Sequence, residues 1–435
     1  MHYYSTNHQS PLASLQEAVV KGLAPDKGLY MPQTIKQLPA PFFETIDRLS
    51  FQEMAYRVAD AFFGEDIDAD ILKQIVYETL SFETPLVKVD PDSYSLELFH
   101  GPTLAFKDVG ARFMARLLGY FIKKQGQRNV KVLVATSGDT GSAVANGFLG
   151  VDGIHVYVLY PKGLVSNIQE KQFTTLGQNI TAIEVDGTFD DCQRLVKSAF
   201  MDAALNEKMH LTSANSINVA RFLPQAFYYF NAYAQLKRSG KTGRIVVSVP
   251  SGNFGNITAG LFAKRMGLPI ARFIAANNKN DIFLHYLQTG DYSPRPSVAT
   301  LANAMDVGDP SNFARVLALY DGSHEKICAD ISGCRYLDEQ IKSIIKECYA
   351  STGYLLDPHG ACGYQALKDN LKAGETGVFL ETAHPAKFAD TVESIIGKKI
   401  AIPEKLQAFM QGQKRAISLS KEFEELKELL VHEAI

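Results

Sequence analysis

The sequence predicts an α/β fold of open, twisted parallel sheets, with a helical module at the N-terminal end. Two observations lead to this fold class. From about Tyr94 onward, short apolar runs rich in β-branched residues alternate with longer stretches of helical periodicity. Before Asp90, apolar residues instead recur at steps of three and four, as on one face of a helix. Repeated strand–loop–helix units are typical of parallel sheets covered on both faces, joined by short right-handed connections.

The N-terminal module is predicted to be helical because three of its segments are amphipathic. Proline residues at 32, 39 and 41 interrupt the chain between the first two segments. The predicted helices cover residues 12–24, 51–64 and 69–82.

Four apolar runs after the module predict strands, and each is followed by a helical pattern. The strands are Val130–Ala135, Ile154–Tyr160, Ile180–Val185 and Ile245–Val249, and the helices are 141–150, 167–175, 189–205 and 257–267. A last amphipathic helix is expected over 420–434, capped by Ser420 and burying Phe423, Leu426 and Leu430.

Composition narrows the class of protein. The net charge is −3, with 44 Lys and Arg against 47 Asp and Glu, so no broad basic face for nucleic acid is expected. Five cysteines without a CxxC pair argue against a disulfide framework and for a reducing compartment. The spacing of His324, Cys328 and Cys334 fits no common zinc site, so no metal is expected. No signal peptide and no apolar run of about 20 residues is found, which predicts a soluble, cytoplasmic protein.

The segment 100–113, HGPTLAFKDVGARF, places Lys107 directly after an apolar run and before Asp108. An amine in an apolar pocket has a lowered pKa, which favours imine formation and proton transfer. Taken alone, such a triplet more often marks a surface lysine whose stem lies along apolar groups. Both interpretations stay open from these residues.

The segment SGNFGN, Ser251–Asn256, follows a predicted strand and precedes a predicted helix. Its glycines allow backbone amides to converge at a helix N-terminus, which favours a phosphate. Asn253 and Asn256 tolerate the positive φ that such loops often need. The segment is neither a P-loop nor a GxGxxG fingerprint, and a tight turn without a ligand is the alternative.

A similar loop, TSGDTGSA, covers residues 136–143 between a strand and a helix. The hydroxyls of Ser137 and Thr140 and the loop amides are suited to a carboxylate. Because the carboxylate of Asp139 would repel an anion, we expect its side chain to cap the following helix. A capped turn without a ligand explains the segment about as well.

These motifs, followed by NSINVAR at 215–221 and ETAHPAKF at 381–388, resemble in their order those of the threonine synthase family, whose members have the type II fold of pyridoxal-phosphate enzymes. YYST at 3–6 and EAVVKGLAPDKGLYMP at 17–32 are also similar to that family. The resemblance extends over nearly the whole chain.

The resemblance implies a pyridoxal 5′-phosphate enzyme in which Lys107 carries the cofactor and acts as the catalytic base and acid. Thr382 would place its hydroxyl at the pyridine nitrogen, although a helix cap before His384 explains it without the resemblance. The cofactor phosphate would be held by Ser251, Gly252, Asn253, Phe254, Gly255 and Asn256.

The substrate implied by the resemblance, O-phospho-L-homoserine, carries a carboxylate and a phosphate. The carboxylate is expected at Ser137, Gly138, Asp139 and Thr140, and the phosphate at Asn215, Ser216, Asn218 and Arg221. A guanidinium matches phosphate geometry, and in a helix Asn218 and Arg221 share one face. A surface Arg221 with capping Asn and Ser is the alternative. His359 could face the site, but a structural turn explains it equally.

The resemblance also implies how the chain is organised. We expect a helical module over 1–93, a smaller α/β domain over 94–240 with the cofactor lysine and the substrate loop, and a larger α/β domain over 241–435 with the phosphate loop. The expected reaction yields L-threonine and phosphate from O-phospho-L-homoserine and water. A related lyase that forms a keto product, or a noncatalytic cofactor-binding homologue, would carry the same motifs. The protein is expected to act as a monomer or homodimer, without nucleic-acid or membrane partners.

Overall fold

The computed structural model describes residues 1–126 and 129–432. Contacts within it separate two compact units, each assembled from several stretches of chain. Unit 1 combines Met1–His2, Met31–Phe106 and Phe222–Ala401, and unit 2 combines Tyr3–Tyr30, Lys107–Arg221 and Ile402–Ile435. The predicted boundaries after residues 93 and 240 differ from this division, because the chain passes from one unit to the other several times.

Unit 1 contains a six-stranded sheet in the order β12-β11-β10-β13-β5-β4. The neighbours from β12 to β5 are parallel, while β4 runs antiparallel to β5. The predicted strand 245–249 is confirmed as β10. In sheet order the strands are Ile331–Arg335, Ile270–Asn277, Arg244–Pro250, Glu375–Glu381, Ser93–Glu97 and Leu86–Asp90.

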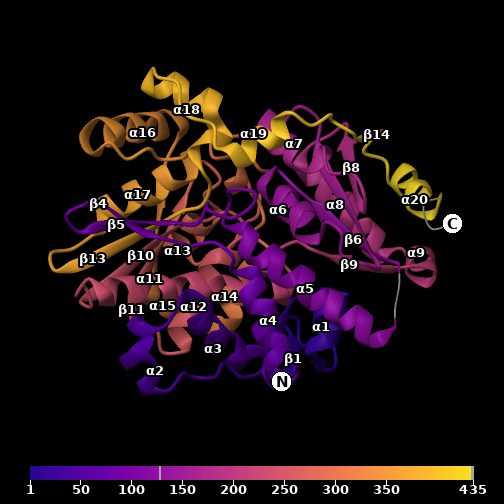
Figure 1. The fold of residues 1–435 in the computed structure, drawn as a ribbon, viewed down its shortest axis with the longest axis horizontal. Helices are drawn as coiled ribbons and strands as arrows, with labels where there is room; N and C mark the ends of the chain where they lie inside the picture. Colours follow the sequence, from indigo (N-terminus) through magenta and orange to yellow (C-terminus); the bar gives the residue numbers. More distant parts are fainter. Residues whose placement is uncertain (127–128, 433–435) are drawn as a thin grey trace. The chain divides into compact units, whose positions relative to one another are not determined.

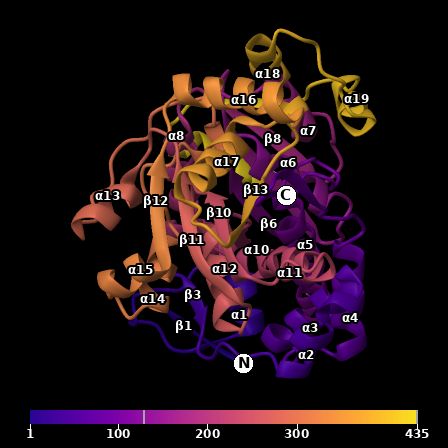
Figure 2. The same ribbon diagram turned by 90° about the vertical axis from the view of Figure 1, so that its left-hand side faces the viewer.

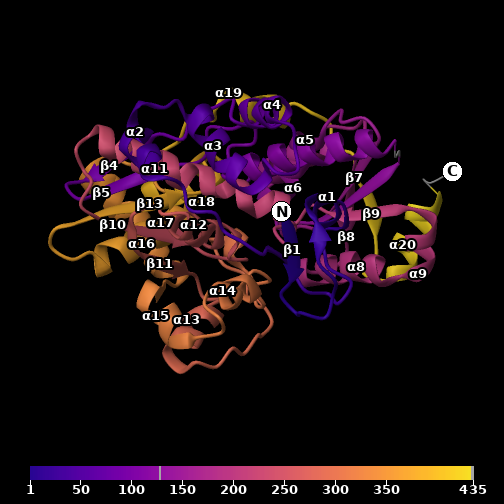
Figure 3. The same cartoon turned by 90° about the horizontal axis from the view of Figure 1, so that it is seen from below.

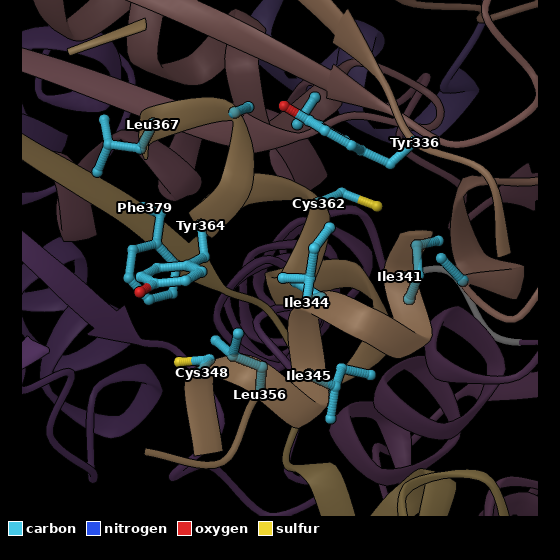
Figure 4. Packing of buried hydrophobic residues seen from close by; sticks show 14 of the residues in the cluster. Tyr336, Ile341, Ile344, Ile345, Cys348, Leu356, Cys362, Tyr364, Leu367 and Phe379 are labelled. Carbon is cyan, nitrogen blue, oxygen red and sulfur yellow. The ribbon is translucent and has the colours of Figure 1, made fainter. Parts of the chain in front are cut away.

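One face of this sheet packs on α16 (Asp338–Thr352) and α17 (Pro358–Asn370), with α18 (Ala389–Ile396) behind them. Figure 4 shows side chains of this core, among which the rings of Tyr364 and Phe379 lie 5.4 Å apart. Each large apolar side chain buried in this way stabilises the fold by roughly 1.5–3 kcal/mol.

The other face of the sheet packs on α11 (Ala226–Arg238) and α12 (Gly255–Arg265). Helices α2, α3 and α4 of the N-terminal segment belong to the same unit. A third group of short helices, α13, α14 and α15, gathers beside β11 and β12 (Figures 2 and 3). These six helices span Ala40–Thr45, Phe51–Phe63, Ala69–Thr79, Ile282–Thr289, Phe313–Leu319 and His324–Asp330.

Unit 2 contains a five-stranded sheet in the order β14-β8-β7-β6-β9, parallel throughout. Helices α8, α9 and α20 cover one face, and α6 covers the other with α5 and α7 beside it (Figure 1). The strands are Ile417–Leu419, Ile180–Val185, Ile154–Pro161, Val130–Ala135 and His210–Ser213. The helices α5 to α9 span Lys107–Gln125, Asp139–Phe148, Asn167–Thr174, Phe189–Met201 and Ala203–Lys208, and α20 spans Phe423–His432.

The predicted helices are confirmed, most of them with shorter bounds, while α6 and α12 begin and end two residues before the predicted positions. One predicted helix is divided. The helix expected over 189–205 breaks at Asp202, whose carboxylate accepts the Leu205 amide and so begins α9. In the C-terminal helix Leu426 and Leu430 are fully buried and Phe423 partly so, and Ser420 accepts the amide of Glu422. Residues 433 and 434 of that predicted helix lie outside the described residues.

The opening of the chain holds short strands that the periodicity did not predict. Strands His2–Ser5, Ala13–Ser14 and Tyr30–Pro32 form a sheet in the order β2-β1-β3, with α1 at Leu15–Lys21. Two- to four-residue strands are too short for alternation to register in the sequence. Within the described part of the chain, no helix is both long and apolar enough to cross a bilayer.

Candidate active site

The loop Ser251–Asn256 joins the carboxyl end of β10 to the N-terminus of α12. The Ser251 amide donates to the Ala276 carbonyl at 2.9 Å, and the Ser251 carbonyl accepts the Asn277 side-chain amide at 3.0 Å. A Cβ at Gly252 would lie only 2.7 Å from the Ala304 carbonyl oxygen. The loop is therefore held close against neighbouring backbone, at a position where only glycine fits without displacement.

The left-handed residue of this loop is Phe254, with φ of 64°, although Asn253 and Asn256 tolerate this conformation better. The ring of Phe254 packs 4.6 Å from that of Phe283, which holds the side chain in this unfavourable backbone conformation. Asn256 instead donates from its side chain to the Pro250 carbonyl.

Phe254 precedes α12 and supplies no side-chain cap, and within the first turn only the Ile257 amide is shown bonded to a side chain, at Oδ1 of Asn256. The amides of its first turn are thus directed toward the loop, which gives a site of positive potential. Such a site fits the phosphate of a cofactor.

Thr382 lies at the carboxyl end of β13, the parallel neighbour of β10. It is 5% exposed, and its carbonyl accepts the Phe106 amide at 2.9 Å. Ala105 and Ala383 form an antiparallel bridge beside this bond. The helical turn that follows is capped by His384, whose Nδ1 accepts the Ala386 amide, so Thr382 is not the helix cap.

Lys107 follows Phe106 directly and is the first residue of α5. It is half-buried. Leu104, two residues before Phe106, has φ of 57°, a conformation that costs an L-residue about 1 kcal/mol or more. The His384 amide donates to the Leu104 carbonyl. This tight turn and the bond from Phe106 to Thr382 fix where the backbone enters Lys107.

The loop of residues 136–140 follows β6 in unit 2. The Thr136 hydroxyl accepts the amides of Gly138 and Gly141, so Thr136 caps α6 and the cap predicted for Asp139 is wrong. Asp139 accepts instead from the side chain of Gln169 at 2.9 Å. Gly138 has φ of 139° and lies against the same carboxamide. Ser137 and Thr140 are half-buried, at positions suited to an anion.

The segment 215–221 meets this loop through Asn215, whose side-chain amide donates to the Ala135 carbonyl at 3.0 Å. Ser216 beside it is half-buried. Asn218 is fully buried, and its side chain bonds to the Val19 carbonyl and the Ala220 amide. The polar atoms of Asn218 thus shape the segment, and contact with substrate stays a prediction for it.

Arg221 belongs to the short helix α10 (Val219–Phe222) and is 2% exposed, which excludes the surface arginine of the alternative interpretation. Burial lowers the pKa of Arg221 to about 10, while the charge of Asp108 opposes that shift. A Cβ at Gly110 would collide with the Arg221 carbonyl, so α5 approaches α10 closely. Arg221 therefore places a buried positive charge beside the beginning of α5.

A buried acid lies beside Thr382 in unit 1. Glu381 accepts the Asp357 amide at 2.6 Å, and burial together with the charge of Asp357 raises the pKa of Glu381 well above its usual value. Asp357 caps α17 and contacts Nδ1 of His359 at 2.5 Å, while Nε2 of His359 accepts the Ala304 amide. His359 is thus a structural residue of this turn, with both ring nitrogens bonded.

Sequence patterns did not identify several residues that shape the site. Thr136, Gln169 and Glu381 lie within or against the motifs and are buried, but single polar residues in a glycine loop give no periodic signal. Among the described residues no cluster of three His, Cys, Asp or Glu side chains could hold a metal ion.

A lysine at the start of a helix and a helix N-terminus after a glycine loop, on parallel sheets, are features expected of an enzyme that binds pyridoxal phosphate. Comparison with protein families agrees: the family described as pyridoxal-phosphate dependent enzyme matches residues 78–382. The cofactor is pyridoxal 5′-phosphate.

The chain belongs to the threonine synthase family. The threonine synthase N terminus matches residues 2–80, and the threonine synthase C-terminal family matches residues 360–430. Threonine synthase from Haemophilus influenzae is 44% identical over 99% of this chain and 100% of its own length. The crystal structure of threonine synthase from Escherichia coli superposes with a TM-score of 0.94 at 42% identity, with both chains covered completely. The structure of pyridoxal-phosphate-bound threonine synthase from Brucella melitensis superposes with a TM-score of 0.93 at 36% identity. This comparison covers 100% of this chain and 99% of the other.

Proposed function

We propose that this enzyme converts O-phospho-L-homoserine and water to L-threonine and inorganic phosphate. The observation that carries the proposal is that threonine synthases correspond to the chain from end to end, at 42–44% identity for two bacterial relatives. The comparison includes the segments 136–140, 215–221 and 251–256, in which we place the two substrate anions and the cofactor phosphate.

When bound, the cofactor withdraws electrons from the α-carbon of an amino-acid substrate and so makes its hydrogens acidic. Lys107 is the base and acid that moves protons at the α- and β-carbons. Thr382, held through its carbonyl by Phe106, would supply a neutral hydroxyl to the pyridine nitrogen. The amides of Gly255 and Asn256, at the beginning of α12, would hold the cofactor phosphate.

The substrate carries two anionic groups that need separate sites. We assign the carboxylate to the loop of Ser137–Thr140, where two half-buried hydroxyls lie at the beginning of α6. The substrate phosphate is assigned to the segment of Asn215, Ser216 and Arg221, where the buried guanidinium of Arg221 supplies positive charge. A cytoplasmic location and a monomeric or homodimeric state complete the proposal.

The first experiment records the visible absorbance of the purified chain before and after addition of O-phospho-L-homoserine, with threonine and phosphate assayed together. We expect a spectral change and equal amounts of the two products. The Lys107→Ala variant should lose turnover by a factor of about 10³ or more, because it removes the proton-transferring amine. Lys124→Ala, at the exposed end of the same helix, is the matched control and should keep wild-type turnover.

The other outcomes separate the alternatives. A keto acid in place of threonine would establish the related lyase. A bound cofactor without spectral change or product would establish the noncatalytic homologue. Near-normal turnover of Lys107→Ala would remove the central role of this lysine.

A further inference from the structure

Arg315 is a fully buried cation that lies behind the phosphate loop, although it belongs to none of the motifs considered above. It sits in α14, the helix that begins beside this loop. Its guanidinium carbon lies 4.0 Å from the ring centroid of Phe222, a cation–π contact within the same unit. Burial of an arginine is costly, so a buried guanidinium in a fixed geometry calls for an explanation.

A continuous chain of hydrogen bonds leads from Arg315 to the loop. Nη1 of Arg315 donates to Oδ1 of Asn312 at 2.7 Å. Nδ2 of Asn312 donates to the Asn253 carbonyl at 3.0 Å, and the Asn312 backbone amide donates to the same oxygen at 3.3 Å. The Ser311 amide donates to Oδ1 of Asn253 at 2.7 Å. Asn253 is thereby held at both its side chain and its carbonyl.

The direction of these bonds gives the chain an electrostatic effect. A guanidinium that donates to the oxygen of an amide group makes the N–H of that group a stronger donor. Asn312 passes this polarisation to the carbonyl of Asn253, which shares its peptide unit with the Phe254 amide. Phe254 precedes α12, so the polarised amide adds to the positive potential at that helix end.

We propose that Arg315 is a positioning residue of the cofactor-phosphate site: through Asn312 it fixes Asn253 and strengthens the loop amides that hold the phosphate. The inference rests on the cofactor assignment and on the phosphate role of the loop, and it does not depend on the amino-acid substrate. Burial lowers the pKa of Arg315 to about 9, which leaves the guanidinium charged at neutral pH.

The test measures the affinity of the full-length chain for pyridoxal 5′-phosphate after the cofactor has been removed. Arg315→Met removes charge and donors but keeps an apolar stem, and Asn312→Ala breaks the chain while leaving the charge. We expect each to raise the Kd of the cofactor by roughly tenfold, the range for hydrogen bonds to charged groups. The double variant should be no weaker than the more affected single variant, because both act through one chain.

Two further variants separate positioning from general stability. Arg315→Lys keeps the charge without the fork and should recover part of the affinity. Arg272→Met is the matched control: Arg272 is a largely buried arginine of the same unit that pairs with Glu375, and its loss should leave the cofactor Kd unchanged. The ³¹P resonance of the bound cofactor should move in Arg315→Met and stay in place in Arg272→Met.

The inference fails if Arg315→Met and Asn312→Ala bind the cofactor as the wild type does, or if their effects on Kd multiply in the double variant. If Arg315→Met does not fold, the cofactor Kd of Asn312→Ala and of Arg315→Lys is compared with that of the wild type instead. The proposal requires both variants to bind the cofactor more weakly than the wild type. A wild-type chain that binds the cofactor but forms no threonine would count against the proposed reaction, while the comparison of cofactor Kd among the variants would still test Arg315.

Discussion

Replacing Gly252 by alanine should displace the phosphate loop and weaken cofactor binding. The added Cβ would lie 2.7 Å from the Ala304 carbonyl oxygen and 2.9 Å from Cα of Met305. Ordinary contacts between such atoms are roughly 3.5 Å, so loop or neighbour must yield by roughly 0.8 Å. Both neighbours are backbone atoms, and the Met305 amide is itself bonded to Ala302, so the loop is expected to move.

The magnitude follows from these overlaps. Overpacking of this kind costs about 1–3 kcal/mol of stability. A displacement approaching 1 Å also misaligns the amides at the beginning of α12, so the Kd for pyridoxal 5′-phosphate should rise by at least about tenfold. Urea denaturation of the cofactor-free chain measures the first effect, and visible absorbance during cofactor titration measures the second.

Gly243→Ala is the matched control because Gly243 precedes the same strand that Gly252 follows. A Cβ at Gly243 would meet only the Gly374 carbonyl, at 3.8 Å, and the residue is exposed. This variant should bind the cofactor normally, with stability unchanged or raised by up to about 1 kcal/mol. Equal stability and equal cofactor Kd in the two variants would refute the close approach at Gly252.

Two pH-dependent predictions concern the groups beside Thr382. The raised pKa of Glu381 means that the folded state binds a proton that the unfolded state has released above about pH 4.5, so wild-type stability is lost as pH rises. Glu381→Gln keeps an acceptor for the Asp357 amide and removes this loss. As pH rises above about 4.5, its stability relative to wild type should therefore increase by up to about 1.4 kcal/mol per pH unit. Urea denaturation measures this difference, and parallel curves for the two proteins would contradict a neutral Glu381. Burial, reinforced by His100, lowers the pKa of His384 to about 4, so the unfolded state binds the extra proton and stability falls as pH drops from about 6.5 to 4. His384→Asn keeps an acceptor for the Ala386 amide, and its urea midpoint should change less over that interval than that of the wild type; an unchanged slope would show that His384 does not titrate there.

The main strands and helices could be predicted from the sequence because a long apolar run, or a long amphipathic pattern, shows which residues will be buried. The strand Val130–Ala135 is buried at every position, as expected of a parallel strand covered on both faces. The short strands at the chain opening and the hairpin of β4 and β5 were not predicted, because a few residues contain too little alternation. The break at Asp202 was missed for a different reason: one capping carboxylate outweighs a periodicity that runs through it.

The site residues likewise divide into those that the sequence predicts and those that depend on tertiary contacts. The ordered motifs predict Lys107, the loop after β10 and Thr382 as site residues through the family resemblance, and these roles stay predictions. Within those loops the cap assigned to Asp139 was wrong, and the positive φ occurs at Phe254 and not at an asparagine. Both choices are settled by competing contacts, with the Thr136 hydroxyl in one loop and the Phe283 ring in the other.

The sequence by itself determined the fold class, the family resemblance and the order of the motifs, since these depend on local pattern along the chain. Only the tertiary structure decided that Arg221 is buried beside the charge of Asp108, that Glu381 meets Asp357, and that Arg315 reaches Asn253 through Asn312. Glu381 and Asp357 lie 24 residues apart in the sequence, and no regular spacing in the sequence indicates that such residues will meet. Their protonation and their role depend on burial and on neighbouring charge, which arise only when the chain is folded.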